Sequence, residues 1–180
     1  VFPLSDDAVA VLISDVTERE LAERTIRRQA YYDDLTGLPN RATFMAMLGE
    51  QTQSLAPTAV LLIDLNRFKE VNDTLGHLSG DAFLRTLGQR LGALAERSAC
   101  SVARLGGDEF AFVVPYRAGP QVASLAQAVL DVCREPVDVL GSAVTRGASI
   151  GIALAPVGAT THEALLRCAD LALYRDKSSR

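Results

Sequence analysis

The chain has 180 residues, 48% of them hydrophobic and 22% charged, which is typical of a globular protein with one core and not of a disordered one. Its formal net charge of −4 argues against a nucleic-acid partner, because DNA and RNA are bound by clustered Lys and Arg. A small phosphorylated ligand needs only a local basic group.

The three cysteines, Cys100, Cys133 and Cys168, lack the C-x-x-C spacing of zinc or redox sites. We therefore expect reduced thiols in a cytoplasmic protein. No apolar run in the chain approaches the roughly 20 residues of a membrane-spanning helix. The start Val1-Phe2-Pro3 has neither an initiator Met nor a signal-peptide layout, and an upstream membrane anchor stays an open question.

The first 32 residues differ in pattern from the rest. The apolar run Ala8–Ile13 predicts one strand without a partner strand nearby in sequence. Thr17-Glu18-Arg19-Glu20 has the form of a capping box, and the charged stretch to Tyr32 predicts an exposed or dimer-pairing helix. The pair resembles the end of a PAS sensor domain (residues 1–16) and its signalling helix (17–32). The alternative is an arbitrary strand and linker.

From Asp33 onward, helices and strands follow one another closely. Pro39 suits the first turn of a helix that runs to Gln51, and Ala59–Ile63 is an apolar run of strand length that leads to Asp64. Further along, the patterns predict helices at 66–73, 81–96 and 120–134, strands at 101–105, 110–114 and 144–155, and a last helix from a Thr160-x-x-Glu163 capping box to about Lys177.

The two strands around residues 106–109 form a hairpin that interrupts the alternation of strands and helices. A sheet that contains such a hairpin is mixed or mainly antiparallel. We therefore expect an α+β fold, a ferredoxin-like sandwich with helices flanking the central sheet, and not a doubly wound parallel sheet.

Three acidic residues stand at places where a ligand could bind. Asp64 ends a strand, where a helix N-cap is an equally good interpretation, and Asp108 and Glu109 lie at a hairpin tip, where solvation alone explains them. Together they can gather hard oxygen ligands, which suit Mg²⁺ or Mn²⁺ and a substrate phosphate. Gly106 and Gly107 let a nucleotide approach the backbone. The combination favours phosphoryl or nucleotidyl transfer.

Six blocks of sequence follow one another between Asp33 and Arg180: DLTGLPNR from Asp34, DLNRFKEVND from Asp64, Gly76-His77 with Gly80-Asp81, RLGGDEF from Arg104, SIGIA from Ser149, and ADLALYRDK from Ala169. Their order and spacing resemble those of GGDEF domains of diguanylate cyclases, over residues 33–180. The resemblance implies a fold similar to that of nucleotide cyclases. His77 is interpreted as a loop residue without a role.

The resemblance implies a metal site and a catalytic turn. Asp64 and Asp108 would be the carboxylate ligands, with the backbone carbonyl of Leu65 as a further ligand. Glu109 would support the turn or help to activate the attacking hydroxyl.

The resemblance also implies a substrate site for GTP. Asn72 and Asp81 would bind guanine, since one carboxylate accepts both the N1–H and the exocyclic amine, a donor pair that adenine lacks. Without the resemblance, both would be interpreted as turn-forming residues of a Gly-containing loop. Basic groups would hold the triphosphate, although isolated lysines are usually solvated. The implied phosphate and backbone contacts are Lys69, Lys177, Phe68, Gly106 and Gly107.

Two stretches depart from the family pattern. The family's last lysine is usually followed by x-x-Gly-Arg, but here Arg180 comes one position early, so its part in phosphate binding stays open. The family's Arg-x-x-Asp product-inhibition site corresponds to Arg97-Ser98-Ala99-Cys100. Since Cys100 supplies no carboxylate, we expect weak or absent product inhibition through this stretch.

The implied reaction joins two GTP molecules into cyclic di-GMP, with GTP bound to each member of a homodimer that an upstream sensor domain controls. The alternatives are a GTP-binding regulatory module without turnover, and a ferredoxin-like dimerisation module in which the matched polar residues are incidental.

Overall fold

The computed structural model describes residues 2–5, 8–10, 28–53, 57–155 and 161–178. It divides into two units, residues 1–30 and 31–180. In the first, β1 (Phe2–Ser5) pairs antiparallel with β2 (Ala8–Ala10). The expectation of a lone strand was therefore wrong, although polar Ser5-Asp6-Asp7 between two apolar runs was a turn signal. The capping box at Thr17 and the helix up to residue 27 lie outside the described residues, and residues 28–31 are helical.

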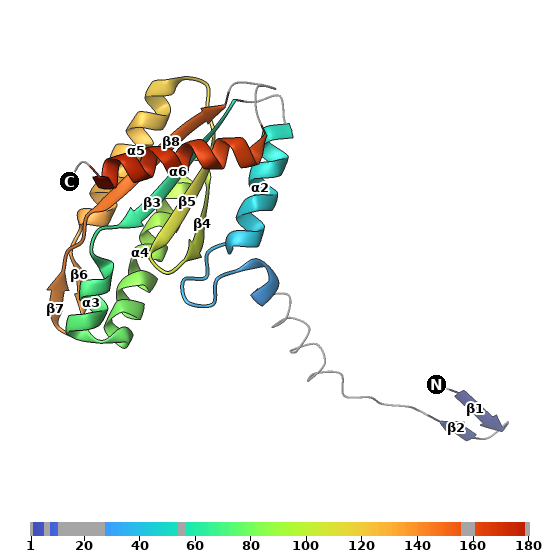
Figure 1. Cartoon of the computed structure of the whole chain (residues 1–180). Helices are drawn as coiled ribbons and strands as arrows, with labels where there is room; N and C mark the ends of the chain where they lie inside the picture. The colour runs from blue at the N-terminus through green and yellow to red at the C-terminus, as the bar shows by residue number, and fades with distance from the viewer. Residues whose placement is uncertain (1, 6–7, 11–27, 54–56, 156–160, 179–180) are drawn as a thin grey trace. The chain divides into compact units, whose positions relative to one another are not determined.

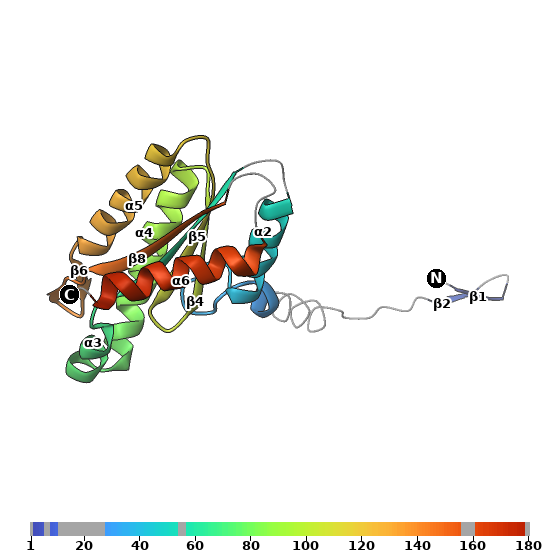
Figure 2. The same cartoon turned by 45° about the horizontal axis from the view of Figure 1, so that its top comes forward.

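The second unit has a four-stranded sheet in the order β4-β5-β3-β8, in which every neighbouring pair is antiparallel (Figures 1 and 2). The α+β sandwich predicted above is confirmed. The elements of this unit are α2 (Arg41–Gln53), β3 (Thr58–Leu65), α3 (Phe68–Leu75), α4 (His77–Arg97), β4 (Ser101–Gly106), β5 (Glu109–Pro115), α5 (Gly119–Arg134), β6 (Val137–Val139), β7 (Ser142–Val144), β8 (Ala148–Ala155) and α6 (His162–Ser178).

Helices cover both faces of the sheet, and β3 is buried between them. Because alternate side chains of a strand face opposite sides, Leu61 and Ile63 pack with α3, α4 and α5, whereas Val60 and Leu62 pack with α2 and α6. This double burial explains why β3 has a continuous apolar sequence. No helix among the described residues is long and apolar enough to cross a membrane.

Helices α2 and α6 begin later than the sequence pattern predicted. The side chain of Asn40 accepts a hydrogen bond from the backbone N–H of Thr43 at 3.0 Å, so Asn40 is the N-cap of α2. Pro39 instead pairs with Tyr32 in an isolated β-bridge. In α6 the Thr161 hydroxyl accepts from Ala164 N–H at 3.3 Å, while Thr160 lies outside the described residues.

A single glycine separates α3 from α4. Gly76 has a φ of 82°, a left-handed conformation that glycine adopts without a steric penalty. Gly80 lies inside α4, although the pattern predicted that this helix begins after it. Asn72 and Asp81 therefore belong to two successive helices and not to a loop, which removes the interpretation of both as turn-forming residues of a loop.

Candidate active site

The sheet register brings the acidic residues of β3 and of the β4–β5 turn together. Asp64 pairs directly with Glu109, and opposed residues of antiparallel strands direct their side chains to the same face. The turn between the strands contains Gly106 and Gly107, with φ values of 140° and 52°. Beyond it, the carbonyl of Asp108 accepts a hydrogen bond from Leu65 N–H at 3.4 Å.

The last turn of α6 adds a basic group to this cluster. Lys177 Nζ lies 2.6 Å from Asp64 Oδ2, and the Asp64 side chain is only 14% exposed. Burial and the nearby charge of Asp64 raise the pKa of Asp108, while Lys177 and Arg104 oppose that shift. The structure thus brings Asp64, Asp108 and Lys177 together from β3, the turn and α6.

The carboxylates at the end of β3 form a small donor set for a metal ion. Among the described residues, no group of three or more His, Cys, Asp or Glu side chains is arranged to hold one. Mg²⁺ requires less, since it is often bound by one or two carboxylates with water and substrate phosphates. The repulsion between Asp64 and Asp108 marks a place where a divalent cation would be stabilised. The carboxylates of Asp64 and Asp108 therefore fit a cation whose other ligands come from the substrate.

A depression of 440 Å³ adjoins Asp64 and is also lined by Lys177, Asn66, Arg67 and Ser149. The Ser149 hydroxyl donates to the Asn66 side-chain oxygen at 3.1 Å. Arg67 adopts a left-handed conformation, with φ 56°, which is uncommon outside glycine. No role of their own was predicted for Asn66, Arg67 and Ser149, because a left-handed φ cannot be recognised from the residue pattern.

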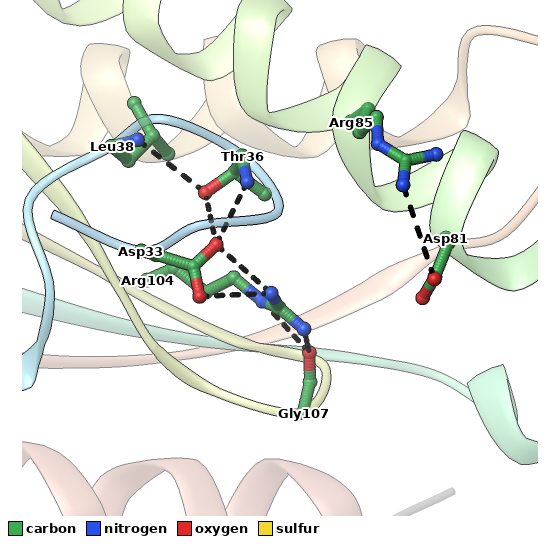
Figure 3. Close-up of polar contacts among 7 residues, drawn as sticks. All are labelled: Asp33, Thr36, Leu38, Asp81, Arg85, Arg104 and Gly107. Atoms are coloured by element: carbon green, nitrogen blue, oxygen red, sulfur yellow. Dashed lines mark hydrogen bonds and ion pairs between the residues drawn. The ribbon is translucent and has the colours of Figure 1, made fainter. Parts of the chain in front are cut away.

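Asn72 and Asp81 lie on neighbouring helices at the other side of the β3 end. A Cβ added to Gly80 would collide with Asn72 Oδ1, so the Asn72 amide rests on the bare backbone of α4. Asp81 makes a loose ion pair with Arg85, at 4.0 Å, and both side chains are about half exposed (Figure 3). The Asp81 carboxylate is therefore accessible to a ligand.

Two further residues named from the sequence occupy different environments. Phe68 is buried, and its ring packs against Phe83 with a centroid separation of 6.0 Å. The ring belongs to the core, and the backbone N–H of Phe68 lies at the first position of α3. Lys69, the next residue, is exposed.

The stretch that corresponds to the product-inhibition site lies at the end of α4. Arg97 is exposed, while Cys100 is partly buried and its thiol lies 3.6 Å from the carbonyl oxygen of Ala95. Burial raises the pKa of Cys100 to about 11. The thiol is therefore neutral at physiological pH and supplies no charge to pair with a guanine. Arg180, the other departure, lies outside the described residues.

Known proteins resemble the second unit closely. Residues 30–180 match the family described as diguanylate cyclase, GGDEF domain. The chain is 41% identical over 157 residues to the diguanylate cyclase TpbB of Pseudomonas aeruginosa, which covers 83% of this chain and 36% of TpbB. It is 41% identical over 174 residues to an uncharacterised signalling protein of Caulobacter vibrioides, which covers 93% of this chain and 21% of that protein.

The solved structure of the GGDEF domain of TpbB is similar to this one with a TM-score of 0.78 and 40% identity, over 83% of this chain and 90% of that one. The chain spans little more than a third of TpbB and about a fifth of the Caulobacter protein. The family match itself covers most of the chain, and on it we conclude that the chain belongs to the GGDEF-domain family of diguanylate cyclases.

Proposed function

We propose that this domain is a diguanylate cyclase that condenses two GTP molecules into cyclic di-GMP and releases two pyrophosphates. The observation that carries the proposal is the cluster at the end of β3. There Asp64 lies beside the turn that holds Asp108 and Glu109, with Lys177 Nζ at 2.6 Å.

Asp64, Asp108 and the Leu65 carbonyl would hold Mg²⁺ or Mn²⁺, and the bound ion would neutralise phosphate charge and align the reacting oxygens. Lys177, whose side chain is partly exposed, would exchange its contact with Asp64 for a contact with triphosphate oxygens. The exposed ammonium of Lys69 and the N–H of Phe68 at the start of α3 contribute to the same phosphates. Gly106 and Gly107 leave room for them at the turn.

Asn72 and Asp81 select guanine. The accessible Asp81 carboxylate accepts the N1–H and the exocyclic amine, and adenine would leave that carboxylate without these donors. The Asn72 amide, seated on Gly80, adds a second polar contact from the adjacent helix.

Each domain holds one nucleotide, so the reaction needs two domains that face each other. The 3′-oxygen of one GTP forms a bond to the α-phosphorus of the other, and the bond from that phosphorus to the bridging oxygen breaks as pyrophosphate leaves. Glu109, exposed at the start of β5, would take the proton of the hydroxyl. Pairing thereby provides the proximity on which the rate depends.

We propose further that the segment before the domain controls its activity, and that cyclic di-GMP does not inhibit it. A PAS-like segment and its helix, residues 1–32, would set how two domains meet. Since Cys100 is a neutral thiol, added cyclic di-GMP should not slow turnover through Arg97. Strong inhibition that disappears in Arg97→Ala would contradict this part.

The function is tested by incubating the purified protein with GTP and Mg²⁺ and measuring cyclic di-GMP and pyrophosphate. We expect both products from the wild type and from Asp131→Asn, a control on the exposed face of α5. We expect neither product from Asp64→Ala or Asp108→Ala. Tight GTP binding by the wild type without any product would refute the cyclase and favour a regulatory GTP-binding module.

A further inference from the structure

Residues 33–39, here called the entry loop, lead from the beginning of the second unit to α2. The loop is closed by its own hydrogen bonds, from Asp33 N–H to the Leu38 carbonyl at 2.8 Å and from Gly37 N–H to the Asp33 carbonyl at 2.9 Å. Asp33 Oδ1 also accepts from the N–H and the hydroxyl of Thr36, at 2.8 and 2.7 Å. The Asp33 carboxylate is thus held in one orientation.

The side chain of Arg104, on β4, joins this loop to the turn of the candidate active site (Figure 3). Its Nη1 donates to both carboxylate oxygens of Asp33, at 2.9 and 3.0 Å. Its Nε and Nη2 donate to the carbonyl oxygen of Gly107, at 3.1 and 2.7 Å. One planar guanidinium therefore contacts two segments that are far apart in sequence.

The contact between Arg104 and Asp33 is held in place by burial and by further hydrogen bonds. The Arg104 side chain is only 10% exposed, and its backbone N–H donates to the Pro39 carbonyl at 2.9 Å, so the loop is attached to β4 twice. Burial alone would raise the pKa of Asp33, but the hydrogen bonds from Thr36 and Arg104 outweigh burial and lower it. Asp33 is therefore ionised at neutral pH, and charge-assisted bonds to a fixed fork are strong and directional.

The Gly107 carbonyl belongs to the same peptide plane as the N–H of Asp108. Gly107 has a left-handed φ of 52° and no side chain, so its own packing does little to hold that plane. We propose that Arg104 is a positioning residue of the cyclase, which fixes the Gly107–Asp108 peptide and so the direction of the Asp108 carboxylate, with Asp33 as its anchor. This inference rests on the proposed function.

The test uses Arg104→Lys, which keeps the charge but loses the fork, and Asp33→Asn, which keeps the shape but loses the charge. Arg134→Lys is the matched control, because Arg134 lies on α5 in a loose, exposed pair with Asp131 at 4.0 Å. Turnover is measured per folded protein. We expect kcat to fall roughly ten- to a hundredfold in the first two variants, with a smaller change in KM for GTP, since Asn72 and Asp81 are untouched.

The double variant should lose no more activity than the worse single variant, because both substitutions break one unit. The inference would be overturned if the loss of activity in these variants were fully explained by a larger fraction of unfolded protein. A kcat in Arg104→Lys equal to that of the Arg134→Lys control would also overturn it.

Hydrogen exchange of the amides of residues 105–110 provides a readout that does not depend on turnover. We expect faster exchange there in Arg104→Lys and Asp33→Asn than in Arg134→Lys, while the amides of α5 exchange alike in all three. If the wild type forms no cyclic di-GMP, the proposed cyclase is refuted and exchange alone decides the positioning role. Equal exchange in the turn would overturn it.

Discussion

Gly80 shows how a missing side chain can shape a binding site. A Cβ at this position would collide with the Asn72 amide, whereas Gly49 in α2 has no atom within 4 Å of an added Cβ. The proposed guanine contact of Asn72 therefore requires glycine at position 80, whereas nothing near position 49 requires glycine, so Gly49 is a matched control.

Gly80→Ala should displace Asn72 and raise KM for GTP about tenfold, the equivalent of one polar contact. Gly49→Ala should leave KM unchanged and stabilise α2 by about 0.5–1 kcal/mol, since alanine is the better helix former. Steady-state kinetics and thermal unfolding measure the two effects. An unchanged KM in Gly80→Ala would separate Asn72 from guanine binding.

The ion pair between Asp33 and Arg104 predicts how stability depends on pH. The pKa of Asp33 is lowered by folding, so its contribution is present above the unfolded value of 3.8 and is lost as pH falls through the lower folded value. Asp33→Asn should therefore lower Tm at pH 7, and the difference from the wild type should shrink toward pH 3. A difference that is constant with pH would show that charge is not involved.

Helix α6 packs closely on the sheet at Gly151 of β8. An added Cβ at Gly151 of β8 would collide with the backbone of Ala169 and Leu173. This close contact holds the helix whose last turn carries Lys177 to Asp64.

Gly151→Ala should push α6 outward and destabilise the fold by about 1–3 kcal/mol, because backbone atoms cannot rotate away as a flexible side chain can. The outward shift should also weaken the contact of Lys177 and lower kcat per folded molecule. Urea unfolding and kinetics test the two parts, with Gly49→Ala as the control. Wild-type stability would mean that the helix adjusts freely.

The sequence predicted the order of the elements well because β3, α4 and α5 carry long, regular apolar patterns. It missed the hairpin of β6 and β7, whose runs of three residues are shorter than a recognisable strand. The residue that could have indicated it is Gly141, because a two-residue hairpin turn favours glycine; in the structure Leu140 and Gly141 both have positive φ.

In the site, the resemblance named Asp64, Asp108 and Lys177, which the fold brings together. The pair formed by Arg104 and Asp33 joins residues 71 positions apart, and no local pattern predicts such a contact. The burial of the Phe68 ring could not be predicted either. An apolar residue in a site motif has the same sequence pattern whether its ring contacts the ligand or the core.

For the molecule as a whole, the proposed GTP site draws on both helical layers. Asp64 and Lys177 face the side of α6, whereas Asn72 and Asp81 come from α3 and α4, which pack on the opposite face of the sheet. A site built at the end of a sheet in this way depends on the integrity of the whole core. Substitutions far from the nucleotide should therefore change activity through stability.

The three thiols give the domain a built-in labelling site. Burial raises the pKa of Cys100 to about 11 and that of Cys133 to about 12, while Cys168 is exposed on α6. Since the thiolate is the reactive form, a maleimide at pH 7 should modify Cys168 first, and Cys168→Ser should abolish that fast phase. A fluorophore or spin label placed there would report, without any engineered cysteine, how close two copies come when nucleotide is added.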